Sequence, residues 1–150
     1  ITSPTKAFNM SGMQIANVIC ADADLRQRIS SEASAVGIYG ANPVALACTQ
    51  ALYSEGVPWL ESAARTIRAN LLELQQVCAS DRKLAMRLPD GGYLAWVDAR
   101  SFDGSFLDYA RSRGYLLSPG TRFGMGGEGF VRVNVACSRE CFSSFIAAVL

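Results

Sequence analysis

The chain has 150 residues, half of them hydrophobic, so it is long enough to bury the core of one domain. Fourteen basic and thirteen acidic residues leave a net charge of +1, without a basic cluster. This charge pattern argues against nucleic-acid binding and against membrane association. We expect no signal peptide, and the start at Ile1 rather than Met indicates that the beginning of the natural polypeptide is missing.

Histidine is absent, which excludes Ser–His–Asp and Cys–His catalysis within this chain. The cysteines are scattered and lack CxxC spacing, so the sequence predicts no metal site, and it favours the reducing cytoplasm. They are Cys20, Cys48, Cys78, Cys137 and Cys141. Difficult chemistry would come from a cofactor, or from lysine, tyrosine, cysteine and carboxylate side chains.

The N-terminal part predicts a loop and a capped helix. Residues 1–12 (ITSPTKAFNMSG) are rich in turn-forming residue types and predict the loop. Residues 13–20 form a short apolar run that fits either a strand or a buried helix. Asp22 is a suitable capping residue for a helix over about 23–35.

Two further helices are predicted before residue 81. Asn42 supplies a capping side chain and Pro43 the first helical residue of a helix that should end near Ser54. Apolar residues then recur at three- and four-residue steps, which predicts a long amphipathic helix over about 58–79. This stripe consists of Leu60, Ala64, Ile67, Leu71, Leu74 and Cys78. We place a domain boundary at the end of this helix.

Beyond that boundary the pattern changes to the two-residue period of strands. In chain order we predict strands over 84–88 and 92–98, a helix over 103–113, a glycine-rich loop over 115–129, a strand over 130–136 and a final helix from its cap Ser138 to Leu150. The chain is therefore predicted to be an α/β protein in which helices are followed by a ββαβα small domain of α+β type. Residues 1–80 and 81–150 are the two predicted domains.

Lys6 is the first candidate catalytic residue. Hydroxyl residues precede it and apolar residues follow it in SPTKAFNMSG (residues 3–12), and such surroundings would bury the amine in its neutral, nucleophilic form. Ser3 stands three residues upstream, where its hydroxyl could contact a phosphate. Without that context, a lysine near a chain end is a solvated surface charge.

Arg132 is the second candidate. In FVRVNV (residues 130–135) the valines share one face of the strand, and Arg132 and Asn134 share the other. One interpretation is a half-exposed strand with a polar outer face. The other is that Arg132 faces a cleft and holds a carboxylate through two parallel hydrogen bonds.

Residues 3–12 resemble the lysine loop of fold-type I enzymes that depend on pyridoxal 5′-phosphate (PLP), the aminotransferase superfamily. They are most similar to the carbon–sulfur β-lyase (cystathionine β-lyase-like) group, whose loops read S-P-[ST]-K-[TA]-F-N-[LI]-[AS]-G. Residues 124–137 (GMGGEGFVRVNVAC) resemble the C-terminal signature of this group, and residues 92–98 (GYLAWVD) resemble a strand motif that packs the small domain. The resemblance covers essentially the whole chain and implies the C-terminal part of the PLP-dependent transferase fold.

The resemblance also implies roles for single residues. Lys6 would carry PLP as a Schiff base, Ser3 would help to hold the cofactor phosphate, and Arg132 would bind the α-carboxylate of a small amino-acid substrate. Gln14 stands where many class I aminotransferases have a phosphate-binding arginine, which favours the lyase group. Residues 39–43 lie where family members often reach the active site of the neighbouring subunit of a homodimer.

The implied reaction is β-elimination from cystathionine or cysteine conjugates, which yields a thiol, pyruvate and ammonia. An aminotransferase would use the same residues, so the sequence leaves this alternative open. A non-enzymatic alternative is an inactive fragment or a small interaction module. The partners of the pyridine ring and most phosphate donors lie upstream in the family, so the 150-residue piece alone is expected to bind PLP weakly or not at all.

Overall fold

The computed structural model describes residues 1–80 and 82–150; Asp81, the first residue of the predicted small domain, lies outside the described residues. The chain divides into two compact units, residues 1–61 and 62–150. This division falls within the long helix α4 (Val57–Ser80), whereas the sequence placed the domain boundary at the end of that helix. The boundary near residue 80 stays a prediction.

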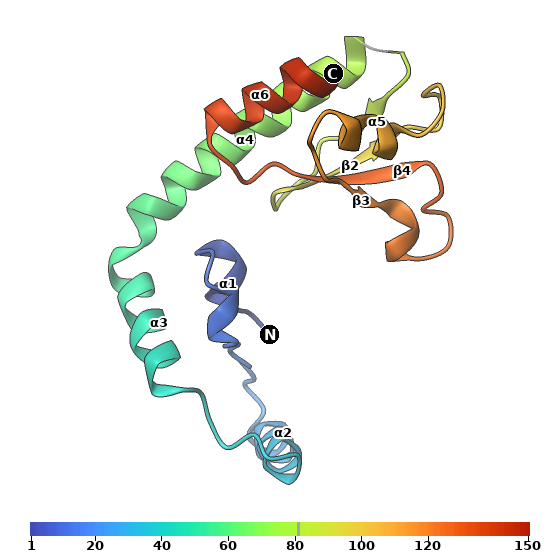
Figure 1. Ribbon diagram of the computed structural model, residues 1–150. Coiled ribbons are helices and arrows are strands. Elements are labelled where there is room, and N and C mark those ends of the chain that lie inside the picture. Colours follow the sequence, from blue (N-terminus) through green and yellow to red (C-terminus); the bar gives the residue numbers. More distant parts are fainter. Residues whose placement is uncertain (81) are drawn as a thin grey trace. The chain divides into compact units, whose positions relative to one another are not determined.

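The first unit is mostly helical (Figure 1). Its elements are α1 (Pro4–Ala7), the 3-10 turn η1 (Ser11–Met13), α2 (Ala23–Ala35), α3 (Pro43–Glu55) and the start of α4. Asp22 caps α2 and Asn42 caps α3 through side-chain oxygens that accept main-chain N–H groups at 2.9 and 2.8 Å. Both caps confirm the sequence-based prediction. The predicted ends of the two helices are also close to those observed.

The first twelve residues are more ordered than predicted. Within the expected loop, α1 forms because Ser3 accepts a hydrogen bond from the Thr5 N–H at 3.2 Å and Pro4 takes the first helical position. The apolar run over residues 13–20 is neither of the two predicted alternatives. It contributes the buried Ile15 and one isolated antiparallel bridge to the start of the chain.

The second unit is built on a four-stranded antiparallel sheet with the strand order β1-β2-β4-β3 (Figure 1). The strands are β1 (Ala85–Met86), β2 (Leu94–Asp98), β3 (Ser118–Pro119) and β4 (Phe130–Asn134). The two longest strands, β2 and β4, pair in the middle of the sheet, and Trp96 lies opposite Arg132. Helices α5 (Phe106–Ser112) and α6 (Arg139–Val149) complete the unit together with the C-terminal part of α4.

Alternation along β4 separates a buried face of the sheet from an open one. Val131 and Val133 are buried, while Arg132 between them is half-buried on the opposite face. The buried face packs against one cluster of helical side chains: Leu71, Leu74, Cys78, Phe106, Ala110, Phe142, Phe145 and Val149. Three of these residues belong to the predicted apolar stripe of the long helix. With the core on one face, the other face of the sheet is left for functional side chains.

The helices followed by an antiparallel sheet confirm the predicted fold class. One part of the order was wrong, because the predicted loop over residues 115–129 contains β3 and a 3-10 turn, η2 (Gly120–Phe123). β3 pairs with β4 so that Ser118 lies opposite Arg132. Within the described part of the chain, none of the helices combines the length and the apolar character needed to cross a membrane.

Candidate active site

Lys6 lies in α1 of the first unit, and its side chain is exposed. Its Nζ donates a hydrogen bond to Ser11 Oγ at 3.2 Å. The expectation that apolar neighbours bury this amine is wrong for this chain, because Pro4 and Thr5 take the buried side of the short helix. The amine is therefore accessible, and among the described residues it contacts a neutral hydroxyl rather than a carboxylate.

Ser3, the predicted phosphate contact, already has a structural role. Its Oγ donates to the Ile15 carbonyl at 2.6 Å. Since a hydroxyl carries a single proton, the Thr5 hydroxyl, 2.8 Å away, must donate to Ser3 rather than accept from it. Ser3 thus caps α1 and ties it to the following segment. To donate to a phosphate, Ser3 would have to release the Ile15 carbonyl.

Arg132 is held from two sides on the open face of the sheet. Its Nη2 donates to Ser118 Oγ at 3.2 Å, and its guanidinium carbon lies 4.5 Å from the centre of the Phe123 ring. The ion pairs found among residues 1–80 and 82–150 do not include Arg132. Since a guanidinium has five N–H donors, Arg132 can still bind a carboxylate from outside.

Arg100 provides a contrast on the same face. Its guanidinium carbon also lies over an aromatic ring, 4.8 Å from the centre of Phe130, but it makes two hydrogen bonds of 2.9 and 2.6 Å to the Asp98 carboxylate. These hydrogen bonds lower the pKa of Asp98 and raise the pKa of Arg100. The charge of Arg100 is therefore already balanced, whereas the contacts of Arg132 with other described residues are to neutral groups.

Trp96 lies between the two arginine–aromatic pairs. Its ring meets Phe123 edge-on at 5.7 Å and stacks on Phe130 at 5.6 Å between ring centres. A hollow of about 510 Å³ borders this cluster and is lined by residues 85–90 with Trp96, Asp98 and Phe130. Arg132 does not line it, so this hollow is a neighbouring feature rather than the site of the guanidinium.

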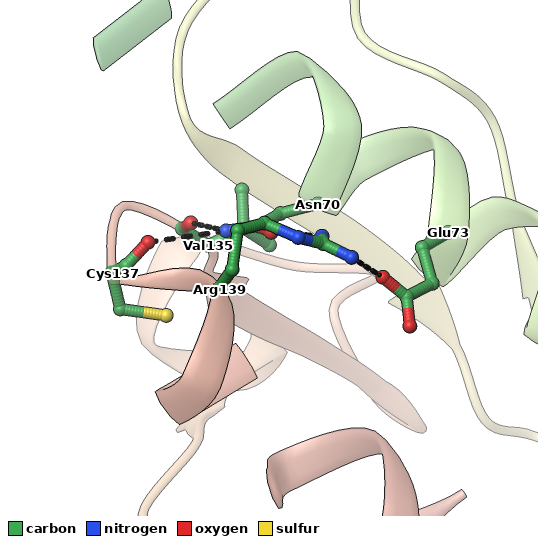
Figure 2. Close-up of polar contacts among 5 residues, drawn as sticks. All are labelled: Asn70, Glu73, Val135, Cys137 and Arg139. Carbon is green, nitrogen blue, oxygen red and sulfur yellow. Dashed lines mark hydrogen bonds and ion pairs between the residues drawn. The ribbon is translucent and has the colours of Figure 1, made fainter. Parts of the chain in front are cut away.

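Asn70 ties α4 to the chain that follows β4 (Figure 2). Its side chain is completely buried, and its Nδ2 donates to the carbonyls of Val135 and Cys137 at 2.9 and 3.2 Å. Its Oδ1 accepts from Arg139 Nη1, and Arg139 Nη2 pairs with Glu73, each at 2.5 Å (Figure 2). The Asn70 amide thus holds the chain that follows β4 through its NH2 group and holds Arg139 of α6 through its oxygen.

Three residues of this region were not predicted from the sequence: Asn70, Ser118 and Phe123. A signal existed for Asn70, which stands on the buried stripe, three residues after Ile67 and four before Leu74. A polar residue at such a position indicates a buried hydrogen bond. Ser118 and Phe123 carry no such signal, because their contacts depend on the pairing of β3 with β4.

The predicted site residues fall in different units. Lys6 and Ser3 belong to the first, and Arg132 belongs to the second. Their meeting at one ligand therefore stays a prediction. The part of the chain that the structure describes contains no group of three or more side chains suited to a metal ion.

No family model matches the chain, but curated proteins and solved structures do. Cystathionine β-lyase PatB of Bacillus subtilis is 34% identical over 141 residues, which are 91% of this chain and 36% of PatB. Protein MalY of Escherichia coli is 28% identical over 156 residues, 100% of this chain and 40% of MalY. The chain thus spans well under half of the length of either relative.

Solved structures agree in fold along almost the whole chain. One is a PLP-bound protein of Clostridium difficile 630, assigned as an aminotransferase, which is 30% identical with a TM-score of 0.85. The match covers 98% of this chain and 39% of that protein. The PLP-bound C–S lyase of Staphylococcus hominis is 25% identical with a TM-score of 0.80 and the same coverage, 98% and 39%. Along its whole length the chain is therefore similar to the C-terminal part of fold-type I PLP-dependent enzymes, namely cystathionine β-lyases and related aminotransferases.

Proposed function

We propose that this chain is part of a PLP-dependent C–S β-lyase that acts on cystathionine or cysteine conjugates. The observation that carries the proposal is Arg132, a half-buried guanidinium held by a hydroxyl and an aromatic ring rather than by a carboxylate. Such a group suits the α-carboxylate of an amino acid, since two parallel hydrogen bonds fix its orientation as well as its charge. Similarity to the cystathionine β-lyase PatB favours β-elimination. The chain spans 36% of PatB, so the activity of the whole polypeptide is itself part of the proposal.

Two residues of the first unit, Lys6 and Ser3, suit the aldehyde and the phosphate of PLP. Lys6 offers an exposed amine to the PLP aldehyde, and its contact with Ser11 at 3.2 Å is with a neutral hydroxyl. Ser3 would donate its hydrogen bond to the phosphate in place of the Ile15 carbonyl, while Gln14 would bring no charge to the phosphate. When bound, PLP withdraws electrons from the Cα atom of an attached amino acid.

Lys6 and Arg132 would have separate roles toward the substrate. Arg132 would bind the α-carboxylate and so fix the orientation of the substrate. With an amino acid held on PLP, the free amine of Lys6 would accept the proton from Cα. The Cβ–S bond would then break and the sulfur would leave as a thiol, taking up the proton held by Lys6. The remaining three-carbon fragment would be hydrolysed to pyruvate and ammonia.

A second candidate function is transamination, favoured by the similarity to the Clostridium difficile protein. It differs in the fate of the proton, which Lys6 would return to the cofactor carbon while the Cβ–S bond stays intact. We further propose a cytoplasmic homodimer, because the scattered cysteines suit a reducing compartment and the resemblance implies two subunits.

The test uses the full natural polypeptide that contains this chain. After incubation with PLP and reduction with borohydride, peptide mass spectrometry should find the adduct on Lys6 in the wild type and in the matched Lys83→Ala control, but not in Lys6→Ala. Cystathionine should then yield pyruvate and a thiol in equal amounts. A keto acid without thiol would favour the aminotransferase, and the absence of any adduct on Lys6 would exclude both enzymes.

A further inference from the structure

Two neutral side chains from one short segment fix the guanidinium of Arg132. Ser118 lies in β3, and Phe123 ends the η2 turn that follows it. We propose that Ser118 and Phe123 are positioning residues that hold Arg132, before any substrate arrives, in the orientation that receives a carboxylate. This inference rests on the carboxylate-binding role of Arg132 in the proposed function.

The hydroxyl of Ser118 is placed by the register of the sheet. Ser118 and Arg132 are directly paired across β3 and β4, so their side chains project from the same face at neighbouring positions. The resulting hydrogen bond of 3.2 Å fixes Nη2, one edge of the planar guanidinium. Because β4 is hydrogen-bonded on both sides, by β2 and by β3, the main chain beneath Arg132 is fixed as well.

Phe123 fixes the plane of the guanidinium rather than its edge. The guanidinium carbon lies 4.5 Å from the ring centre, the range of a cation–π contact. The ring is itself steadied by the edge-on contact with Trp96. Phe123 is 49% exposed, so burial in the core does not explain the position of its ring. Its contacts with Arg132 and Trp96 explain that position.

The choice of neutral partners is what distinguishes Arg132 from Arg100. Asp98 holds Arg100 firmly but also balances its charge. Ser118 and Phe123 hold Arg132 without adding a negative charge, so the full attraction for a carboxylate remains. An arginine ordered in advance loses less conformational entropy when it binds, which strengthens binding without changing the chemistry that follows.

Steady-state kinetics of the PLP-loaded full polypeptide test this role. We expect KM for cystathionine to rise about fivefold in Ser118→Ala and about threefold in Phe123→Leu, with kcat within about twofold, as for the loss of uniform binding. Ser118→Thr keeps the hydroxyl and Phe123→Tyr keeps the ring, so both should stay near the wild-type KM. Arg100→Gln is the matched control and should leave KM unchanged.

A second measurement does not depend on catalysis. In the substrate-free polypeptide with ¹⁵N-labelled arginine, NMR should show slow rotation about the Nε–Cζ bond of Arg132, and faster rotation in Ser118→Ala and Phe123→Leu. If the wild type turns over no cystathionine but rotation responds in this way, the proposed function fails and the positioning role stands. If the variants lose only thermal stability, with KM and rotation unchanged, the positioning role is overturned.

Discussion

The side-chain amide of Asn70 donates to the main-chain carbonyl of Val135 at 2.9 Å and so joins α4 to the end of β4. We expect Asn70→Leu to lower the free energy of unfolding by about 2–4 kcal/mol, because two carbonyls and Arg139 lose the buried amide that serves as their partner. Urea unfolding measures the change. Gln76→Leu, at an exposed position of the same helix, should have little effect, and equal effects of the two changes would contradict the prediction.

Gly127 and Gly120 pack main chain against main chain beside β4. A Cβ atom on Gly127 would overlap the carbonyl group of Gly120, which has no flexible side chain to move aside. We expect Gly127→Ala to cost about 1–3 kcal/mol of stability, measured by thermal unfolding. Gly91→Ala is the control, since open space surrounds that position. Unchanged stability of Gly127→Ala would show that this close approach does not constrain the loop.

The Asp98–Arg100 pair should make stability depend on pH. In the folded state, the hydrogen bond from Arg100 lowers the pKa of Asp98, and this effect outweighs the opposing effect of burial. The pair therefore stabilises the fold above the unfolded pKa of about 3.9, and this contribution is lost as the pH falls through the lower folded pKa. We expect Asp98→Asn to reduce the difference in Tm between about pH 7 and about pH 2.5. An unchanged difference would contradict the assignment.

Cys137 should react slowly with alkylating agents. Burial raises the pKa of its thiol, and the neighbouring Cys141 raises it further, so less thiolate is present near neutral pH. We expect Cys141→Ala to speed the reaction of Cys137 with iodoacetamide at about pH 8 by roughly two- to threefold, because the second cause is removed. Peptide mass spectrometry over time gives the rate. A slower or unchanged reaction would refute the coupling between the two thiols.

Local signals in the sequence predicted most of the helices. Asp22, Asn42 and Ser138 each cap the helix that was expected after them, because a capping hydrogen bond spans only two or three residues. The apolar stripe of α4 and the alternation of β4 are also local patterns. In α1 the Ser3–Pro4 pair was the same kind of signal, but it was treated as part of a loop.

What the sequence did not predict depends on contacts between distant segments. β3 has two residues, too few for any periodicity, and it exists as a strand because β4 pairs with it. The partners of Arg132 could therefore not be named in advance. The burial expected for Lys6 was likewise inferred from its neighbours in sequence, whereas exposure is decided by which side of α1 faces the interior.

The edge strands β1 and β3 have only two residues each, and Pro119 in β3 lacks an N–H group. An incoming strand from another molecule would find few donors and acceptors to pair with at either edge. The longer strands β2 and β4 are shielded between them. The unit should thus resist growth into larger sheets or fibrils, even though its open face displays aromatic rings.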